Sequence, residues 1–354
     1  MKAFDFFCGA GGLTRGLIDG GIEVVAGFDY DVGCLRTYEH NNPGATFIEA
    51  DIREMTMDDL KRIGRARKYD EYLFAGCAPC QPFSSQRKGG GRRHDATLLG
   101  EFGRLVQAAL PGCVLIENVP GLAKVRGFST FRRFLRMLED NGYMFEYGVL
   151  DAKHYGVPQN RRRLVLFASR HVRPSLPDPK YGTALRPYRT VRQAISHFPA
   201  ISAGESHQQI PNHVAASITE LNLERLRHTP KDGGDRRAWP KRLRLECHKG
   251  DYEGHIDVYG RMFWDKPAPA LTGRCHSISN GRYGHPEQDR AISLREAAAL
   301  QSFPDGYEFF GSNKHIALQI GNAVPVRLAE QLGKHVLQLK NSRAMSKVRS
   351  RILA

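Results

Sequence analysis

The chain has 354 residues, and its 41% hydrophobic and 25% charged content is typical of a soluble globular protein that is long enough for two lobes. Its formal net charge of +15 favours a polyanionic partner, above all a nucleic acid. No apolar run approaches the ~18 residues of a membrane span, and a strand-like pattern at residues 2–7 leaves no room for a signal peptide, so we expect a cytoplasmic protein.

Strand-like and helix-like patterns alternate along the chain as far as about residue 170. Short apolar runs predict strands at residues 3–7, 23–28, 46–48, 72–75, 114–117, 143–149 and 164–168. Helical spacing predicts helices in the gaps, at residues 13–19, 32–40, 58–65, 98–110 and 129–141. Alternation of this kind predicts an α/β fold with a Rossmann-like, mostly parallel sheet and helices on both faces.

A glycine-rich turn, F-F-C-G-A-G-G-L at residues 6–13, joins the first predicted strand to the first predicted helix. Such a turn allows close approach of a ligand to the backbone, although it can also serve strand–helix packing alone. Asp29 follows Gly9 by twenty residues, where an acid would hold ribose hydroxyls, and Asp51 could take an adenine amino group. These features predict a nucleoside-bearing cofactor. A dinucleotide is less favoured, because Thr14 occupies the sixth position of G-x-G-x-x-G.

The segment G-C-A-P-C-Q-P-F-S at residues 76–84 follows the fourth predicted strand, at the sheet edge where open α/β folds bind ligands. Cys80 precedes a run of Lys and Arg, and nearby cations favour the reactive thiolate, so we predict that Cys80 is a nucleophile. Cys77 and Cys80 also form a C-x-x-C, which leaves a redox pair or half of a zinc site as alternatives. The pairs Cys247-His248 and Cys275-His276 do not repeat that spacing.

From Pro174 to about Phe310 the sequence is basic, rich in glycine and only weakly periodic, which predicts a smaller, irregular second domain. Residues 180–250 contain thirteen Lys and Arg against six Asp and Glu, an excess of +7. Helices are predicted at residues 294–302 and 326–339. The last residues, 340–354, contain five Lys and Arg and no acid, and we expect a disordered basic tail.

Eight short motifs then follow one another in a fixed order. They are F-x-G-x-G-G at residues 7–12, D-Y-D at 29–31, D-I at 51–52, G-x-x-P-C-Q-P-F-S at 76–84, E-N-V at 117–119, Q-x-R-x-R at 159–163, R-E-A-A at 295–298 with L-Q-S-F-P at 300–304, and G-N-A-V-P at 321–325. This series resembles the bacterial DNA (cytosine-5) methyltransferases of restriction–modification systems, which use S-adenosyl-L-methionine. The resemblance spans Phe4 to about Leu339, apart from a variable segment from roughly Pro174 to Trp264.

The resemblance implies a catalytic set of four residues. Cys80 would attack C6 of a flipped-out cytosine, so that C5 becomes nucleophilic enough to take the methyl group. Glu117 would bind N3 and the exocyclic N4 as a neutral or proton-sharing acid. Arg163 would contact O2 of the base, and Arg161 would brace the surroundings of the nucleophile; strand alternation predicts that the two arginines point together.

The resemblance also implies a cofactor site, and no metal. The methionine part would lie over Gly9, Gly11, Gly12 and Leu13, with Asp29 at the ribose and Pro79 in the same pocket. Adenine would lie between Phe7, Tyr30 and Ile52, with Asp51 at its edge. Asn322 and Val324 would close the pocket, which requires the C-terminal segment to return to the first lobe.

The implied division is a discontinuous catalytic domain (1–173 and 312–339), a target-recognition domain (174–311) and a basic tail (340–354). The expected partner is double-stranded DNA, methylated by a monomer in the bacterial cytoplasm, where DNA binding associates it with the nucleoid. A cognate restriction endonuclease would act independently. A transfer-RNA methyltransferase of the same family, a catalytically silent DNA-binding relative and a nucleotide-dependent oxidoreductase are the alternatives.

The chain departs from the family pattern at three of the residues named here. Cys77-Ala78 stands where the family often has Gly-Pro, so Cys77 is an additional thiol, and Asp29 stands where Glu is commoner. With only two residues between them, Cys77 and Cys80 could form a disulfide that protects an oxidised Cys80.

Overall fold

The computed structural model describes residues 1–66, 68–79, 98–124, 130–246 and 257–352, except the side chains of Lys124 and residues 342–352. The chain divides into two compact units. Unit 1 comprises Met1–Asp151, Arg162–Pro179 and Val324–Ala354, and unit 2 comprises Ala152–Arg161 and Lys180–Ala323. These units are defined by packing alone, so the predicted division into catalytic and target-recognition domains stays a prediction.

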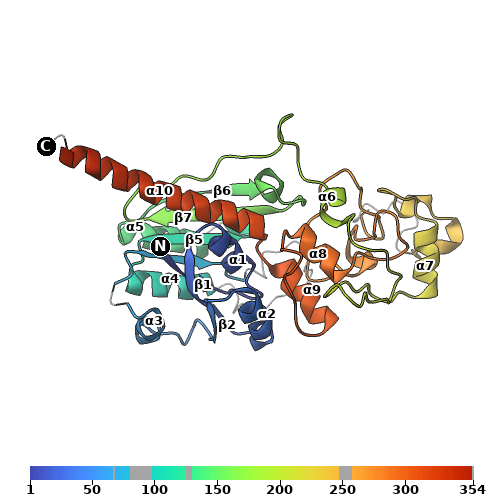
Figure 1. Ribbon diagram of the computed structural model, residues 1–354, viewed down its shortest axis with the longest axis horizontal. Helices are drawn as coiled ribbons and strands as arrows, with labels where there is room; N and C mark the ends of the chain where they lie inside the picture. The colour runs from blue at the N-terminus through green and yellow to red at the C-terminus, as the bar shows by residue number, and fades with distance from the viewer. Residues whose placement is uncertain (67, 80–97, 125–129, 247–256, 353–354) are drawn as a thin grey trace. The chain divides into compact units, whose positions relative to one another are not determined.

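Unit 1 is built on a seven-stranded sheet of order β3-β2-β1-β4-β5-β7-β6 (Figure 1). The strands are β1 Lys2–Phe6, β2 Glu23–Asp29, β3 Thr46–Glu49, β4 Tyr72–Gly76, β5 Cys113–Asn118, β6 Met144–Asp151 and β7 Arg162–Ser169. Neighbours among β1 to β5 pair in parallel, whereas β7 pairs antiparallel with both β5 and β6. All seven predicted strands and the mostly parallel α/β fold are therefore confirmed.

Strand β1 lies at the point where the strand order reverses. The chain leaves β1 toward β2 and β3 on one side and returns to β4 on the other, so the carboxyl ends of β1 and β4 are adjacent. In open α/β sheets this crevice is the usual ligand site. Aromatic side chains fill the core below it, and Phe6 contacts the rings of Phe28, Phe74 and Phe102 at centroid distances of 5.0, 5.3 and 5.2 Å.

The helices of unit 1 follow the strands in alternation. They are α1 Gly12–Asp19, α2 Leu35–Asn41 after the 3-10 turn Val32–Cys34, α3 Met57–Gly64, α4 Leu98–Ala109, α5 Thr130–Asp140 and α10 Val326–Ile352. Helix α4 packs against α3 and α5, and α1 packs against α10 (Figure 1). A Cβ on Gly16 would lie 2.3 Å from Ala329 Cβ, so the α1–α10 crossing requires glycine there.

Helix α10 corrects one expectation. The sequence predicts a helix that ends at Leu339 and a disordered tail beyond it, but the helix continues to Ile352. Residues 340–352 contain neither glycine nor proline, so nothing in them interrupts helical hydrogen bonding.

Unit 2 is irregular, as the sequence predicts. Its helices are short: α6 Val191–Ile195, α7 Glu220–Arg227, α8 Leu294–Leu300 and α9 Asn313–Asn322. Helices α6, α7 and α9 are absent from the prediction, whereas α8 is confirmed. Its β structure, over the described residues, consists of isolated bridges such as Gln159 with Ala268. A buried ion pair between Arg290 and Glu296, with nitrogen–oxygen distances of 2.7 Å, lies in its core. Of the helices described in either unit, none is long and apolar enough to cross a membrane.

Candidate active site

The turn between β1 and α1 has a strained backbone. Phe7, Gly9 and Gly11 have φ values of 62, 48 and 83°, in the left-handed region that glycine adopts at little cost. The Gly9 N–H donates to Asp29 Oδ2 over 2.8 Å, so the end of β2 holds the turn in place. The sequence-predicted cofactor residues Gly9 and Asp29 are thus brought together.

Asp29 accepts two backbone hydrogen bonds. Besides the one from Gly9, its Oδ1 accepts from the Asp31 N–H over 3.0 Å. Burial raises the pKa of Asp29, and the two N–H donors oppose that rise. A Cβ on Gly9 would meet, among the described atoms, nothing nearer than Asp29 Oδ2 at 4.0 Å. The described atoms therefore leave space beside Gly9, next to this carboxylate.

A buried acid connects β1 and α1, the two elements that flank the turn. Asp5 of β1 is 0% exposed; Thr14 Oγ1 donates to its Oδ2 over 2.7 Å and lies 3.0 Å from the Tyr38 hydroxyl. Burial raises the pKa of Asp5 to about 7. Asp5 was not predicted as a site residue, although an acid inside an otherwise apolar strand was the available signal.

The residues predicted around adenine differ in exposure. Ile52 belongs to the buried core, Phe7 packs against that core, and Tyr30 is 71% exposed. Asp51 pairs with Arg53, whose Nε lies 2.8 Å from Oδ1, and this hydrogen bond lowers the pKa of Asp51.

Three strands bring side chains to one edge of the sheet. The sheet pairs Gly76 of β4 with Ile116 of β5, so the next residues, Cys77 and Glu117, lie side by side. Glu117 is 2% exposed, and the Cys77 thiol donates to its Oε2 over 2.8 Å. Arg163 of β7 forms an ion pair with the other oxygen, with 2.9 Å between Nε and Oε1.

The ion pair leaves Glu117 Oε1 incompletely satisfied. This atom is buried and accepts no hydrogen bond from any described residue, because the approach of Arg163 lacks hydrogen-bond alignment. Buried acceptors are normally hydrogen-bonded, and an exception calls for an explanation such as an absent ligand.

The segment that leads to Cys80 is anchored on both sides. The Cys77 N–H donates to the Phe6 carbonyl over 3.3 Å, and Asn118 Nδ2 donates to the Ala78 carbonyl over 2.9 Å. Pro79 is half-buried. Cys80 itself, the loop from Ser84 to Thr97 and the pair Cys247-His248 lie outside the described residues, so the roles predicted for them, and a Cys77–Cys80 disulfide, stay predictions.

Arg161 differs from the expectation. It is 2% exposed in unit 2, where Nη1 donates to the Leu271 carbonyl over 2.8 Å and Nη2 to the Gly321 and Ala323 carbonyls over 3.0 and 3.1 Å. Arg163 instead forms its ion pair with Glu117. Because β7 begins at Arg162, strand alternation does not extend to Arg161, and the roles predicted for the two arginines stay predictions.

The motif at residues 321–325 crosses from one unit to the other. Gly321 packs so closely on the backbone of Thr272 that a Cβ would lie 2.2 Å from its carbonyl. Asn322 is exposed in unit 2, and Val324 is buried in unit 1. Their predicted contact with a cofactor stays a prediction.

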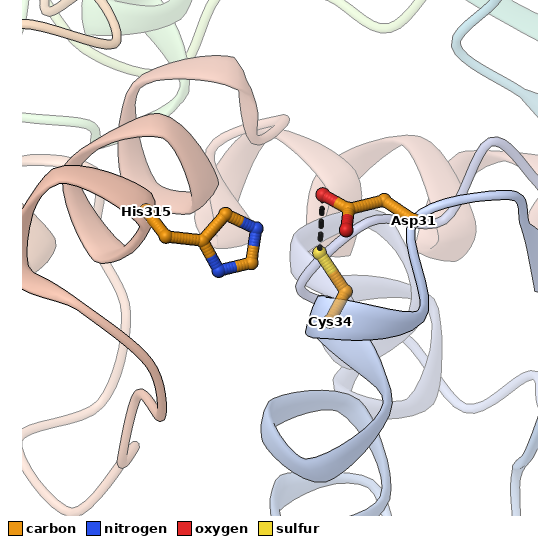
Figure 2. A group of neighbouring side chains, drawn as sticks. All are labelled: Asp31, Cys34 and His315. Atoms are coloured by element: carbon orange, nitrogen blue, oxygen red, sulfur yellow. Dashed lines mark hydrogen bonds between the residues drawn. The ribbon is translucent and has the colours of Figure 1, made fainter.

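Three other thiols are buried. They are Cys8, Cys34 and Cys113, and burial raises the pKa of each, of Cys113 to about 11. Figure 2 shows the Cys34 thiol directed at the Asp31 carboxylate, over 3.7 Å to Oδ2; His315, also drawn there, belongs to unit 2.

Comparison with known proteins agrees with the motif order. A sequence model of the family described as C-5 cytosine-specific DNA methylase matches residues 1–338. The chain belongs to this family. It is 41% identical to the type II methylase M.HgiDII of Herpetosiphon aurantiacus, over 94% of each chain. It is 33% identical to the type II methyltransferase M1.HphI of Haemophilus parahaemolyticus, over 97% of this chain and 88% of that one. This membership supports DNA (cytosine-5)-methyltransferase activity.

Solved structures agree on the fold. A DNA modification methyltransferase encoded within a prophage (E. coli) has a TM-score of 0.70 at 22% identity and covers 96% of this chain and 99% of its own. The Dnmt2 methyltransferase of S. pombe has a TM-score of 0.60 at 16% identity, with coverage of 96% and 98%. At these identities the likeness concerns architecture alone.

Proposed function

We propose that the chain transfers a methyl group from S-adenosyl-L-methionine to C5 of a cytosine flipped out of a specific duplex DNA sequence, through a covalent bond between Cys80 and C6. The observation that carries the proposal is the buried Glu117 carboxylate, paired with Arg163 and left with one unsatisfied oxygen, at the strand end beside the segment that leads to Cys80. A cytosine ring that gains electron density needs an acid at its N3–N4 edge.

The glycine turn supports the cofactor assignment. The open space beside Gly9 and the Asp29 carboxylate suits a ribose, and Tyr30 offers an exposed aromatic surface to adenine. The bound cofactor would supply an electrophilic methyl group on a sulfonium. Asp29 would accept hydrogen bonds from the ribose hydroxyls with lone pairs that its two backbone donors leave available.

The proposed chemistry assigns each step to a residue of the chain. The Cys80 thiolate adds to C6, and Glu117, which would take up a proton when the base binds, passes that proton to N3, which makes C5 nucleophilic. After C5 takes the methyl group, its proton passes to a base such as water, N3 returns its proton to Glu117, and Cys80 leaves from C6, so that the aromatic ring is restored. Arg163 would neutralise charge at O2 of the base, while Arg161 holds the backbone of the Gly321 segment.

Duplex DNA is the substrate we propose, in agreement with the printed names of the type II relatives. The excess of +7 in residues 180–250 suits phosphate contacts around a target sequence. We further propose that the protein acts as a cytoplasmic monomer and that any cognate restriction endonuclease works independently of it.

Product analysis tests this proposal. With labelled cofactor, we expect label at C5 of cytosine in duplex DNA and none in transfer RNA. Duplex DNA that contains 5-fluorocytosine should form a covalent adduct with the native protein and with Cys113→Ser, because fluorine replaces the C5 proton whose loss would release the thiol. Cys80→Ser, which lacks the thiolate, should form no adduct. Label on RNA alone would overturn the substrate, and an adduct with Cys80→Ser would overturn the nucleophile.

A further inference from the structure

The Cys77 thiol is a feature of this chain for which the family resemblance offers no role. Its Sγ lies 2.8 Å from Glu117 Oε2, a close contact for a sulfur donor. A thiol is a weak donor toward neutral acceptors, but a carboxylate acceptor strengthens the bond. The contact joins residues forty positions apart in the sequence. The register between β4 and β5, which pairs Gly76 with Ile116, places the two residues next to each other.

The backbone around Cys77 is held independently of its side chain. The N–H of Cys77 bonds to Phe6 of β1, and the next carbonyl, that of Ala78, accepts from Asn118 of β5. The thiol therefore approaches Glu117 from a fixed base. With Arg163 at Oε1, the carboxylate group has a different partner at each oxygen, and this restricts rotation about its last side-chain bond.

We propose that Cys77 is a positioning residue for Glu117. Its S–H group donates to Oε2, fixes the plane of the carboxylate and leaves Oε1, the oxygen without a hydrogen bond, for the N3–N4 edge of the cytosine. This inference rests on the proposed function of Glu117. It differs from the disulfide hypothesis, because it requires Cys77 as a reduced thiol that points at Glu117.

Kinetics of three variants test the inference. We expect Cys77→Ala to lower the single-turnover methylation rate roughly fivefold, which is the effect of a hydrogen bond of ordinary net strength. The Kd values for duplex DNA and for S-adenosyl-L-methionine should not change. Cys77→Ser keeps a donor and should recover most of the rate. Cys113→Ala, which removes a buried thiol from the start of β5, the strand that carries Glu117, should match the native rate.

Infrared spectroscopy reads the contact directly. The S–H stretching band that is missing from Cys77→Ala should lie at a lower frequency than that of an unbonded thiol, and it should move up in Glu117→Gln, whose side chain is uncharged. This measurement needs no turnover, so it reads the contact in the folded protein even where a variant is inactive.

The outcomes separate the inference from the proposed function. If Glu117→Gln methylates at the native rate, the role proposed for Glu117 is wrong. If Glu117→Gln is inactive while Cys77→Ala keeps the native rate, only the positioning role is overturned. Equal losses in Cys77→Ala and Cys77→Ser, or an S–H band at the frequency of an unbonded thiol, would overturn it as well.

Discussion

At the scale of single residues, the buried Asp5 predicts a pH dependence of stability. Its pKa is raised from 3.8 to about 7 by burial, so the folded protein holds this proton while the unfolded chain releases it. The contribution of the protonated Asp5 to the free energy of unfolding is complete below the pKa of Asp5 in the unfolded chain. It is lost as the pH rises through the pKa of Asp5 in the folded protein. The shift corresponds to roughly 4 kcal/mol, to order of magnitude.

Asp5→Asn removes this titration and keeps an acceptor for Thr14. We expect its free energy of unfolding, relative to the native protein, to increase by a few kcal/mol between about pH 4 and pH 7. Urea unfolding at a series of pH values measures the difference. A constant difference over this range would show that Asp5 is ionised in the folded protein. Asp58→Asn, an exposed residue paired with Lys61, serves as the control.

Asp29 allows a second test at this scale. Asp29→Ala removes the acceptor for the N–H groups of Gly9 and Asp31, which loosens the turn and removes the proposed ribose ligand. We expect S-adenosyl-L-methionine to bind about 1–3 kcal/mol more weakly by calorimetry, as for the removal of a hydrogen bond to a charged group. Unchanged affinity in a folded variant would refute the assignment of Asp29 to the cofactor.

At the scale of elements, the crossing of α1 and α10 depends on one missing side chain. In Gly16→Ala, the new methyl group would lie 2.3 Å from Ala329 Cβ and 2.4 Å from the Val326 carbonyl, so the helices must separate. We expect a loss of about 1–3 kcal/mol in thermal or urea unfolding. Gly100→Ala in α4 is the matched control: no atom of the described residues lies within 4 Å of its Cβ, so it should stabilise the helix slightly. Equal effects of the two substitutions would contradict this account of the crossing.

Elements also mark the limit of prediction from sequence. The seven strands were predictable because each is a short buried run between helical patterns. The pattern of a strand does not show whether it runs parallel or antiparallel to its neighbours, so the antiparallel pairing of β7 was not predictable. Helix α6 has only five residues, and α7 lies in the basic, weakly periodic segment after Pro174, so neither was predictable from apolar spacing. Glu117 was predictable from its motif, whereas its contacts with Cys77 and Arg163 depend on strand register. Arg161 lies one residue before β7, and its hydrogen bonds to the carbonyls of Leu271 and Gly321 join positions more than a hundred residues apart, which no local pattern predicts.

At the scale of the whole molecule, the charge excess of unit 2 predicts a salt-dependent interaction with DNA. Arg236, Arg237, Trp239 and Arg244 line a cavity of about 190 Å³. Arg237 carries an ion pair to Asp235, and the neighbouring Lys241 is exposed. Replacing Arg237 and Lys241 by Gln should weaken DNA binding and reduce the slope of log K against log salt by about 0.9 for each phosphate that the protein no longer neutralises.

The control for this experiment removes the same net charge elsewhere. Lys61 and Arg62 in α3 are exposed and ion-paired with Asp58 and Asp59, and their replacement by Gln should leave the slope nearly unchanged. If both double variants shift the slope equally, the effect is one of net charge, and the cavity does not bind phosphate.

Unit 1 is built from three separate stretches of chain, and this affects the order in which the protein can fold during synthesis. Helix α10, which covers α1, is the last of the described elements to leave the ribosome, so the first lobe to be translated is also the last to be completed. At about 5–20 residues per second, the surface of α1 around Gly16 stays uncovered for many seconds of synthesis. A prematurely terminated chain that lacks α10 therefore lacks a finished sheet domain, even where every strand is present. Truncation before Val326 should therefore lower the yield of folded protein, because the face of α1 around Gly16 stays uncovered.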